Sequence, residues 1–168
     1  MKPEELIAAL RCSGAALAAS FADVSELELR WKPSPDKWSL LEILCHVCDE
    51  ERDDFRHRLA LTLEDPDQDW PPIDPEGWVA QRNYNRAEPH VMLAMFKEER
   101  MASLNWLSGL TVDDWSLAHE HPLGSLAAGD LLSAWVAHDL LHTRQAAWTR
   151  LQWLREAAEP FTPRYAMP

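Results

Sequence analysis

Apolar side chains recur at helical spacing in four long segments of the chain. In the first segment, Leu6, Leu10 and Leu17 are four and seven residues apart, as on one face of an α-helix. No clear strand pattern, with alternating apolar and polar residues, is present. The four segments are residues 4–21, 39–63, 89–109 and 127–154. The pattern predicts an all-α protein, a four-helix bundle with long connections.

The ends of these helices carry residues that favour helix starts and stops. Ser39 and Glu42 fit a capping box, in which each side chain accepts a hydrogen bond from a free backbone N–H of the first turn. Pro89 suits the start of the third helix, and Gly109 suits its end. The last segment, 127–154, is apolar nearly all round, so we expect it to be the most buried element.

The connections between the helices are rich in proline. Residues 31–38 and 65–76 contain several prolines, which exclude a regular helix there. A short helical piece is expected at 77–84, and residues 111–126 are expected to be irregular. We expect the long connections to cover one end of the bundle as a lid.

The length and composition fit one domain over residues 1–168. A chain of 168 residues that is 46% hydrophobic can bury a substantial core, and nine tryptophans suit the walls of a core or cleft. Residues 155–168 are expected to form an irregular C-terminal tail, because prolines interrupt them.

Charge and hydropathy limit which binding partners and which cellular compartment we expect for the protein. The net charge of −12 argues against binding to nucleic acid or to anionic membranes. No apolar run approaches the roughly 20 residues that span a bilayer. The start of the chain lacks the apolar core of a signal peptide. A cytoplasmic protein is therefore expected.

The three cysteines are expected to be reduced thiols. Cys12, Cys45 and Cys48 are odd in number, and no secretion signal accompanies them. Cys45 and Cys48 form one C-x-x-C motif, but the second pair of a structural zinc site is absent. We therefore interpret these two cysteines as small buried side chains, although a ligand role stays open.

Two histidines in the last helix carry the strongest functional pattern. His138 and His142 are four residues apart and share a helix face with Leu131 and Trp135, so they point toward an apolar interior. His46 lies in the second predicted helix. Three neutral imidazoles from two helices can hold one divalent metal ion and leave positions for water or a thiol. A histidine on an apolar face is, however, more often a hydrogen-bonded core residue.

Other residues are candidates for supporting such a site. Glu50 follows His46 by one helical turn and is the first choice for an acceptor that orients a ligating imidazole, with Asp49 as second choice. Trp135, one turn before His138, is a candidate cleft wall, although ordinary core packing is the more common role of such a residue. His119 and His121 precede the last helix and could reach the mouth of a cleft.

Two parts of the sequence resemble the DinB-like superfamily of four-helix bundles. The first is a proline-containing loop, then Trp38-Ser39, then a helix with His46. The second is the glycine-containing loop at 121–124, then a helix with His138-x-x-x-His142 and Gln145. Tyr84 and Arg100 fit the middle section of that family more weakly. One departure is Ala127-Ala128-Gly129, where the family often has a threonine cap.

The resemblance implies a metal site formed by His46, His138 and His142, usually with zinc or nickel. It also implies a homodimer. Family members with assigned chemistry include transferases and isomerases that depend on low-molecular-weight thiols such as bacillithiol or mycothiol, and many members have no assigned activity. The expected function is therefore a metal-dependent enzyme, a thiol S-transferase or a hydrolase, acting on a small molecule.

Two alternatives remain open at this stage. In a non-catalytic binding or sensing module, the metal would be structural and a fourth protein ligand such as Glu50 or Cys45 would close the site. A di-iron carboxylate bundle would need two Glu-x-x-His motifs. The chain has only Asp54-x-x-His57 and Asp139-x-x-His142, which are poor substitutes.

Overall fold

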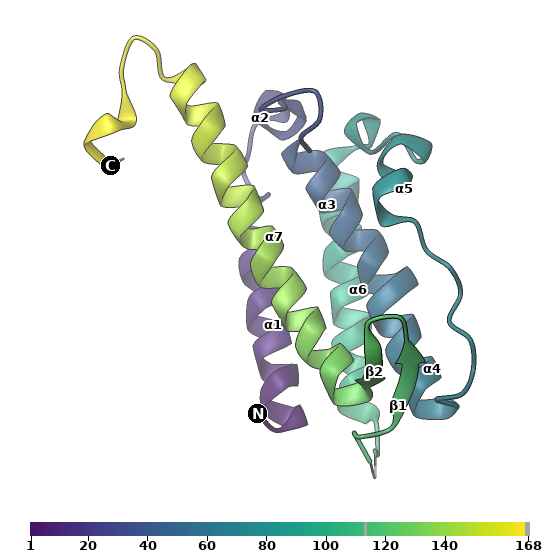
Figure 1. Ribbon diagram of the computed structural model, residues 1–168. Coiled ribbons are helices and arrows are strands. Elements are labelled where there is room, and N and C mark those ends of the chain that lie inside the picture. Colours follow the sequence, from purple (N-terminus) through teal and green to yellow (C-terminus); the bar gives the residue numbers. More distant parts are fainter. Residues whose placement is uncertain (113, 167–168) are drawn as a thin grey trace.

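Four long helical elements form a bundle in the computed structural model, which describes residues 1–112 and 114–166 (Figure 1). The second element is continuous but contains three pieces, because a π-helical segment interrupts it. The elements are α1 (Pro3–Ala19), α3 (Leu40–Asp49) with η1 (Glu50–Arg56) and α4 (His57–Glu64), α6 (Pro89–Gly109), and α7 (Ala128–Ala157). The predicted all-α class and four-helix bundle are confirmed.

The start of α3 has the predicted capping box. The hydroxyl of Ser39 accepts a hydrogen bond from the backbone N–H of Glu42 at 3.1 Å, and Glu42 Oε2 accepts one from the backbone N–H of Ser39 at 2.8 Å. This cap fixes where the helix begins and hence the helix face on which His46 lies. The π-helical turn of η1 was not predicted from the sequence.

The structure corrects the expectation that residues 111–126 are wholly irregular. They contain most of an antiparallel hairpin of β1 (Ala118–His121) and β2 (Gly124–Ala127), which leads into α7. The tight turn depends on Gly124, whose φ of 109° is unfavourable for other residues. The apolar–polar alternation was too short to be recognised as a strand.

The remaining connections contain only short helices. The expected helical piece near 77–84 is present, and the long connection before it passes along the side of the bundle, not over its end as a lid (Figure 1). The tail after α7 extends away from the bundle (Figure 1). The short helices are α2 (Glu26–Arg30), α5 (Pro75–Gln81), η2 (Tyr84–Arg86) and η3 (Pro163–Ala166).

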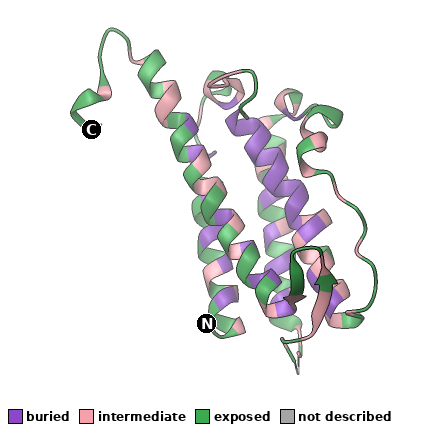
Figure 2. Ribbon diagram, in the orientation of Figure 1, coloured by how far each residue is buried: buried purple, intermediate pink, exposed green. Residues whose placement is uncertain are grey.

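The most buried element is α3, not α7 as the sequence suggested. Every residue of α3 is buried, as the continuous purple ribbon in Figure 2 shows. By contrast, Leu140, Leu141 and Trp148 of α7 are 57%, 53% and 58% exposed. Apolar residues around a helix therefore do not all face the core of this protein. No helix among the described residues is long and apolar enough to cross a bilayer.

Candidate metal centre

Three imidazole rings converge where α3 and α7 pack together. His46 lies in the middle of α3, and His138 and His142 lie one turn apart on α7. The Nε2 atom of His46 is 3.1 Å from that of His142 and 3.3 Å from that of His138, and the last two are 3.1 Å apart. The three ring nitrogens predicted from the sequence thus form one compact cluster.

This cluster fits a divalent metal ion by its spacing. Ligands that are about 2.0–2.1 Å from a tetrahedral zinc ion are separated from one another by about 3.3 Å, close to the observed distances. Among the described residues, the group of His, Cys, Asp and Glu side chains able to hold a metal ion consists of His46, His138 and His142. Three protein ligands leave at least one coordination position open to a small molecule.

Burial keeps the imidazoles neutral, which a metal ligand requires. Burial lowers the pKa of His46 to about 3, with a smaller contribution from His142. Burial lowers the pKa of His138 to about 2, and the two neighbouring imidazoles and Arg100 act in the same direction. The pKa of His142 is also lowered by burial. At neutral pH each ring therefore offers a lone pair to a cation.

The surroundings of the rings fix their orientation. The Oε1 atom of Gln145 lies 2.7 Å from Nδ1 of His142, so Nδ1–H donates a hydrogen bond and Nε2 keeps its lone pair for the cluster. Trp38 packs against His46 and Phe55 packs against His138, with ring centroids 4.8 and 4.9 Å apart. The sequence pointed to Gln145 only through the family resemblance, and it did not point to Phe55 as a neighbour of the site.

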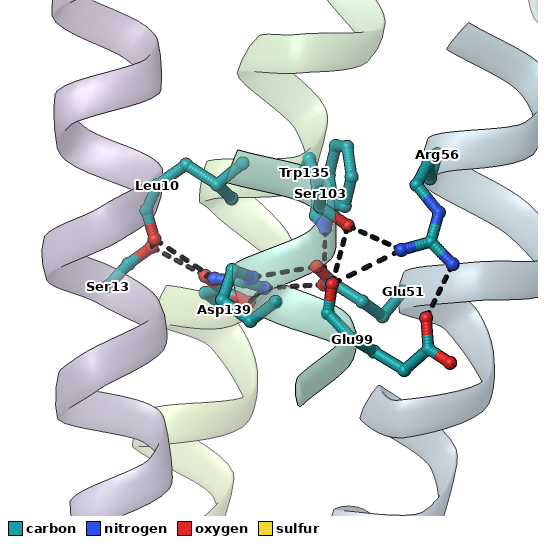
Figure 3. Close-up of polar contacts among 9 residues, drawn as sticks. Leu10, Ser13, Glu51, Arg56, Glu99, Ser103, Trp135 and Asp139 are labelled. Atoms are coloured by element: carbon teal, nitrogen blue, oxygen red, sulfur yellow. Dashed lines mark hydrogen bonds and ion pairs between the residues drawn. The ribbon is translucent and has the colours of Figure 1, made fainter. Parts of the chain in front are cut away.

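A buried ionic network connects α7 with the other helices of the bundle (Figure 3). Asp139, which follows His138, accepts hydrogen bonds from Arg100 at 2.6 and 2.9 Å and from the Ser13 hydroxyl at 2.5 Å. Arg100 also donates to Glu51 at 2.8 and 2.7 Å. The network connects α1, η1, α6 and α7, so it fixes the position from which His138 and His142 project.

Trp135 belongs to the same network. Its side chain is 1% exposed, and its Nε1–H donates a hydrogen bond to Oε2 of Glu51 at 2.9 Å. The indole also stacks on Phe55, with ring centroids 5.6 Å apart. Trp135 therefore links the core to the aromatic surroundings of His138. Its role as a cleft wall stays a prediction.

The two carboxylates considered for orienting a ligating imidazole lie in different surroundings. Asp49 accepts a hydrogen bond from the Tyr84 hydroxyl at 2.5 Å and pairs with Arg82 and Arg52. Glu50 is 5% exposed, and its Oε1 atom has no hydrogen-bond partner among the described residues. Nδ1 of His46 is likewise buried without a partner in that part of the chain.

The other candidate residues lie outside the three-histidine cluster. Cys45 has its thiol directed at the carbonyl oxygen of Tyr84, 3.8 Å away. Burial raises the pKa of Cys45 and of Cys48 to about 12, so both thiols are protonated at neutral pH. His119 and His121 lie on β1 against Trp70, and His119 stacks on that indole at 4.2 Å.

Comparison with known proteins identifies relatives of this fold. A family model described as the DinB superfamily matches residues 9–146. YfiT from Bacillus subtilis, described as "a probable metal-dependent hydrolase with an unusual four-helix bundle topology", superposes with a TM-score of 0.77 at 19% identity. The match covers 88% of this chain and 85% of that chain. No curated protein sequence matches.

A second structure has the same fold at lower similarity. A mycothiol-dependent maleylpyruvate isomerase gives a TM-score of 0.68 at 14% identity, over 86% of this chain and 60% of that chain. A histidine-to-alanine mutant of the same enzyme gives the same values. At these identities the likeness establishes the fold alone.

Proposed function

The chain belongs to the DinB superfamily, and from this premise we propose that it is a metal-dependent enzyme that transfers a low-molecular-weight thiol or hydrolyses a small substrate. The observation that carries the proposal is the approach of the three Nε2 atoms of His46, His138 and His142 to within 3.1–3.3 Å of one another. The close approach of three neutral imidazole nitrogens brings little favourable interaction energy unless a cation lies between them.

The metal we propose is a single zinc or nickel ion. His46, His138 and His142 would hold it, and Gln145 would keep Nε2 of His142 available. A bound divalent ion would act as a Lewis acid that makes the proton of a water molecule or a thiol easier to lose. The protein supplies aromatic surroundings, in which Trp38 packs against His46 and Phe55 packs against His138.

The positions of the side chains around the three histidines favour a catalytic metal site with an open coordination position over a structural site with four protein ligands. A closed site needs a fourth protein ligand, and Cys45 or Glu50 was the candidate. The thiol of Cys45 is directed at the carbonyl oxygen of Tyr84. The carboxylate of Glu50 lies outside the group of ligand atoms that are within 4.8 Å of one another. Three ligands with an open position are typical of catalytic zinc sites.

Related structures motivate the choice of chemistry. One has been described as "a probable metal-dependent hydrolase" and another as a mycothiol-dependent maleylpyruvate isomerase. We therefore propose a small-molecule substrate together with water or a thiol as the second reactant. The test is elemental analysis of the purified protein, followed by binding of small thiols to the metal-loaded chain. A preparation that takes up no divalent metal at neutral pH would reject the proposal.

We also propose that the protein is a cytoplasmic homodimer. The exposed Leu140, Leu141 and Trp148 on the outer face of α7 support association with a second copy, because large apolar side chains at helical spacing are suited to helix packing. The cysteines, which form no disulfide, support a reducing compartment. Sedimentation analysis of the purified chain tests the subunit number.

A further inference from the structure

Glu50 has a buried carboxylate oxygen without a hydrogen-bond partner in the described part of the chain. Its side chain is 5% exposed, and Oε1 lacks a hydrogen-bond partner among the described residues. Leaving a buried polar group unsatisfied costs about 1–3 kcal/mol, so native proteins keep few such groups, and often for a function. The carboxylate of Glu50 is therefore a candidate for binding a group from outside the protein.

Its neighbours in sequence show which way Glu50 faces. Asp49 turns toward the hydroxyl of Tyr84, and Glu51 turns into the core to meet Arg100. Glu50 lies between them and follows His46 by four residues, which places both side chains on the same side of the helix. Four residues advance a helix by about 6 Å, so the carboxyl group lies about one helical turn from the imidazole.

The charges around Glu50 leave a place for a cation. Asp54, one turn further on, shares a hydrogen bond with Glu50 and has its own cation in Arg58, whose Nε lies 2.8 Å from Oδ1 of Asp54. No basic side chain of the described residues forms an ion pair with Glu50 itself. Burial and the nearby carboxylate of Asp54 raise the pKa of Glu50 to about 8, and the smaller opposing effect of the Arg58 charge does not offset them.

An ammonium group is the ligand chemistry that meets these needs. It brings the missing positive charge and hydrogen-bond donors for Oε1, and charge-assisted hydrogen bonds are among the strongest in proteins. In a β-aminothiol the amine is two carbon atoms from the sulfur. Such a molecule can place its sulfur at the three-histidine cluster and its amine toward Glu50.

We propose that Glu50 binds the ammonium group of the thiol cosubstrate, a proposal that rests on the thiol chemistry proposed above. The protein then prefers small thiols that have a protonated amine close to the sulfur. Glu50 is then a specificity-determining residue of the same site. The proposal also gives a role to the only buried carboxylate oxygen that lacks a hydrogen-bond partner in the described part of the chain.

The test compares two thiols of similar size on the full-length, metal-loaded protein. Cysteamine carries an amine where 2-mercaptoethanol carries a hydroxyl group. Calorimetric titration gives the dissociation constant of each thiol for the wild type, for Glu50→Gln and for the control Glu98→Gln, which removes an exposed carboxylate from α6. The metal content of each variant is measured in parallel. The ratio of the two dissociation constants is then compared among the wild type, Glu50→Gln and Glu98→Gln.

We expect Glu50→Gln to reduce the preference for cysteamine about tenfold, as the loss of one charge-assisted hydrogen bond implies. Glu98→Gln should keep the wild-type ratio. The ratio cancels differences between the thiols in acidity and in metal chelation, since these persist in the variant. An unchanged ratio in metal-replete Glu50→Gln overturns this proposal but leaves the thiol chemistry intact. If neither cysteamine nor 2-mercaptoethanol binds the metal-loaded wild type, the thiol chemistry itself is rejected.

Discussion

The Nε2 atoms of His46 and His142 lie 3.1 Å apart, although 96 residues separate them in the chain. Each ring comes from a different helix, and burial keeps both rings neutral. The fold therefore brings together, from two helices, the imidazoles that we propose as ligands of one metal ion.

The first prediction concerns the ligands. His138→Ala should reduce the affinity for zinc at least 100-fold, because two imidazoles from different helices remain where three were held. Metal content is measured by elemental analysis after dialysis against a buffer that contains zinc. His90→Ala, at an exposed position on α6, is the matched control and should keep the wild-type metal content. Full metal occupancy in His138→Ala would remove this histidine from the ligand set.

The second prediction is a pH dependence of stability caused by Glu50. The pKa of this carboxyl group is raised from 4.5 to about 8, mainly by burial. Folding therefore favours the protonated form, and the contribution of Glu50 to stability is lost as the pH rises from about 4.5 to about 8. Glu50→Gln keeps a neutral side chain at every pH. The free energy of unfolding of the metal-free variant, minus that of the metal-free wild type, should therefore be a few kcal/mol larger at pH 8.5 than at pH 5.

Denaturant unfolding of metal-free wild type and Glu50→Gln at the two pH values measures this difference. Glu98→Gln, at an exposed position, should show no comparable change. Equal stability differences between wild type and Glu50→Gln at both pH values would show that Glu50 titrates as an ordinary carboxylate.

The third prediction concerns the buried ionic network. Arg100→Met should destabilise the fold by about 3–5 kcal/mol, because it leaves the buried carboxylates of Glu51 and Asp139 without their common cation. Chemical denaturation provides the measurement. Lys97→Met, on the exposed side of the same helix, serves as the control and should change stability by less than about 0.5 kcal/mol. A similar effect of both substitutions would contradict the importance assigned to the network.

The fourth prediction follows from the close approach of α1 to Arg100. A Cβ atom at Gly14 would lie 2.1 Å from Nη1 of Arg100, whose guanidinium is held on both sides by Glu51 and Asp139. Gly14→Ala should therefore destabilise the protein by about 1–3 kcal/mol despite the higher helix propensity of alanine. Thermal unfolding compares it with Gly109→Ala, where an added Cβ meets no atom of the described residues within 4 Å.

The fifth prediction tests the proposed homodimer. Trp148 is 58% exposed on α7, near the exposed Leu141. Replacing it by glutamate should shift a dimer toward monomers, because a buried unpaired charge is costly at an interface. Sedimentation velocity measures the shift, and Glu98→Gln on α6 provides a control away from this face. A wild type that is monomeric at all accessible concentrations would reject the dimer directly.

The sequence predicted local features well, because they depend on neighbouring residues. The capping box at Ser39 and the helix Pro89–Gly109 follow from turn and cap chemistry. The four-residue spacing of His138 and His142 placed both rings on one face of α7. The approach of His46 to this pair could be expected from residue type and from the family resemblance, but its distance could not.

Features that depend on distant partners were not visible in the sequence. Arg100 and Asp139 are each charged residues in helical segments, and nothing local shows that they meet in the core. Apolar periodicity likewise misjudged α7, because Leu140 and Trp148 do not face the core. The pattern records that a side chain is apolar, but not which surface it meets.

The π-helical turn of η1 has a consequence for how this helix tolerates insertions and deletions. Such a turn holds one residue more than an α-helical turn over the same stretch. Because the π-helical turn absorbs this extra residue, loss of one residue within Glu50–Arg56 would let the helix close into regular α geometry while the residues after Arg56 keep their orientation relative to His46. The helix can therefore shorten by one amino acid between His46 and His57 without turning its core face toward solvent.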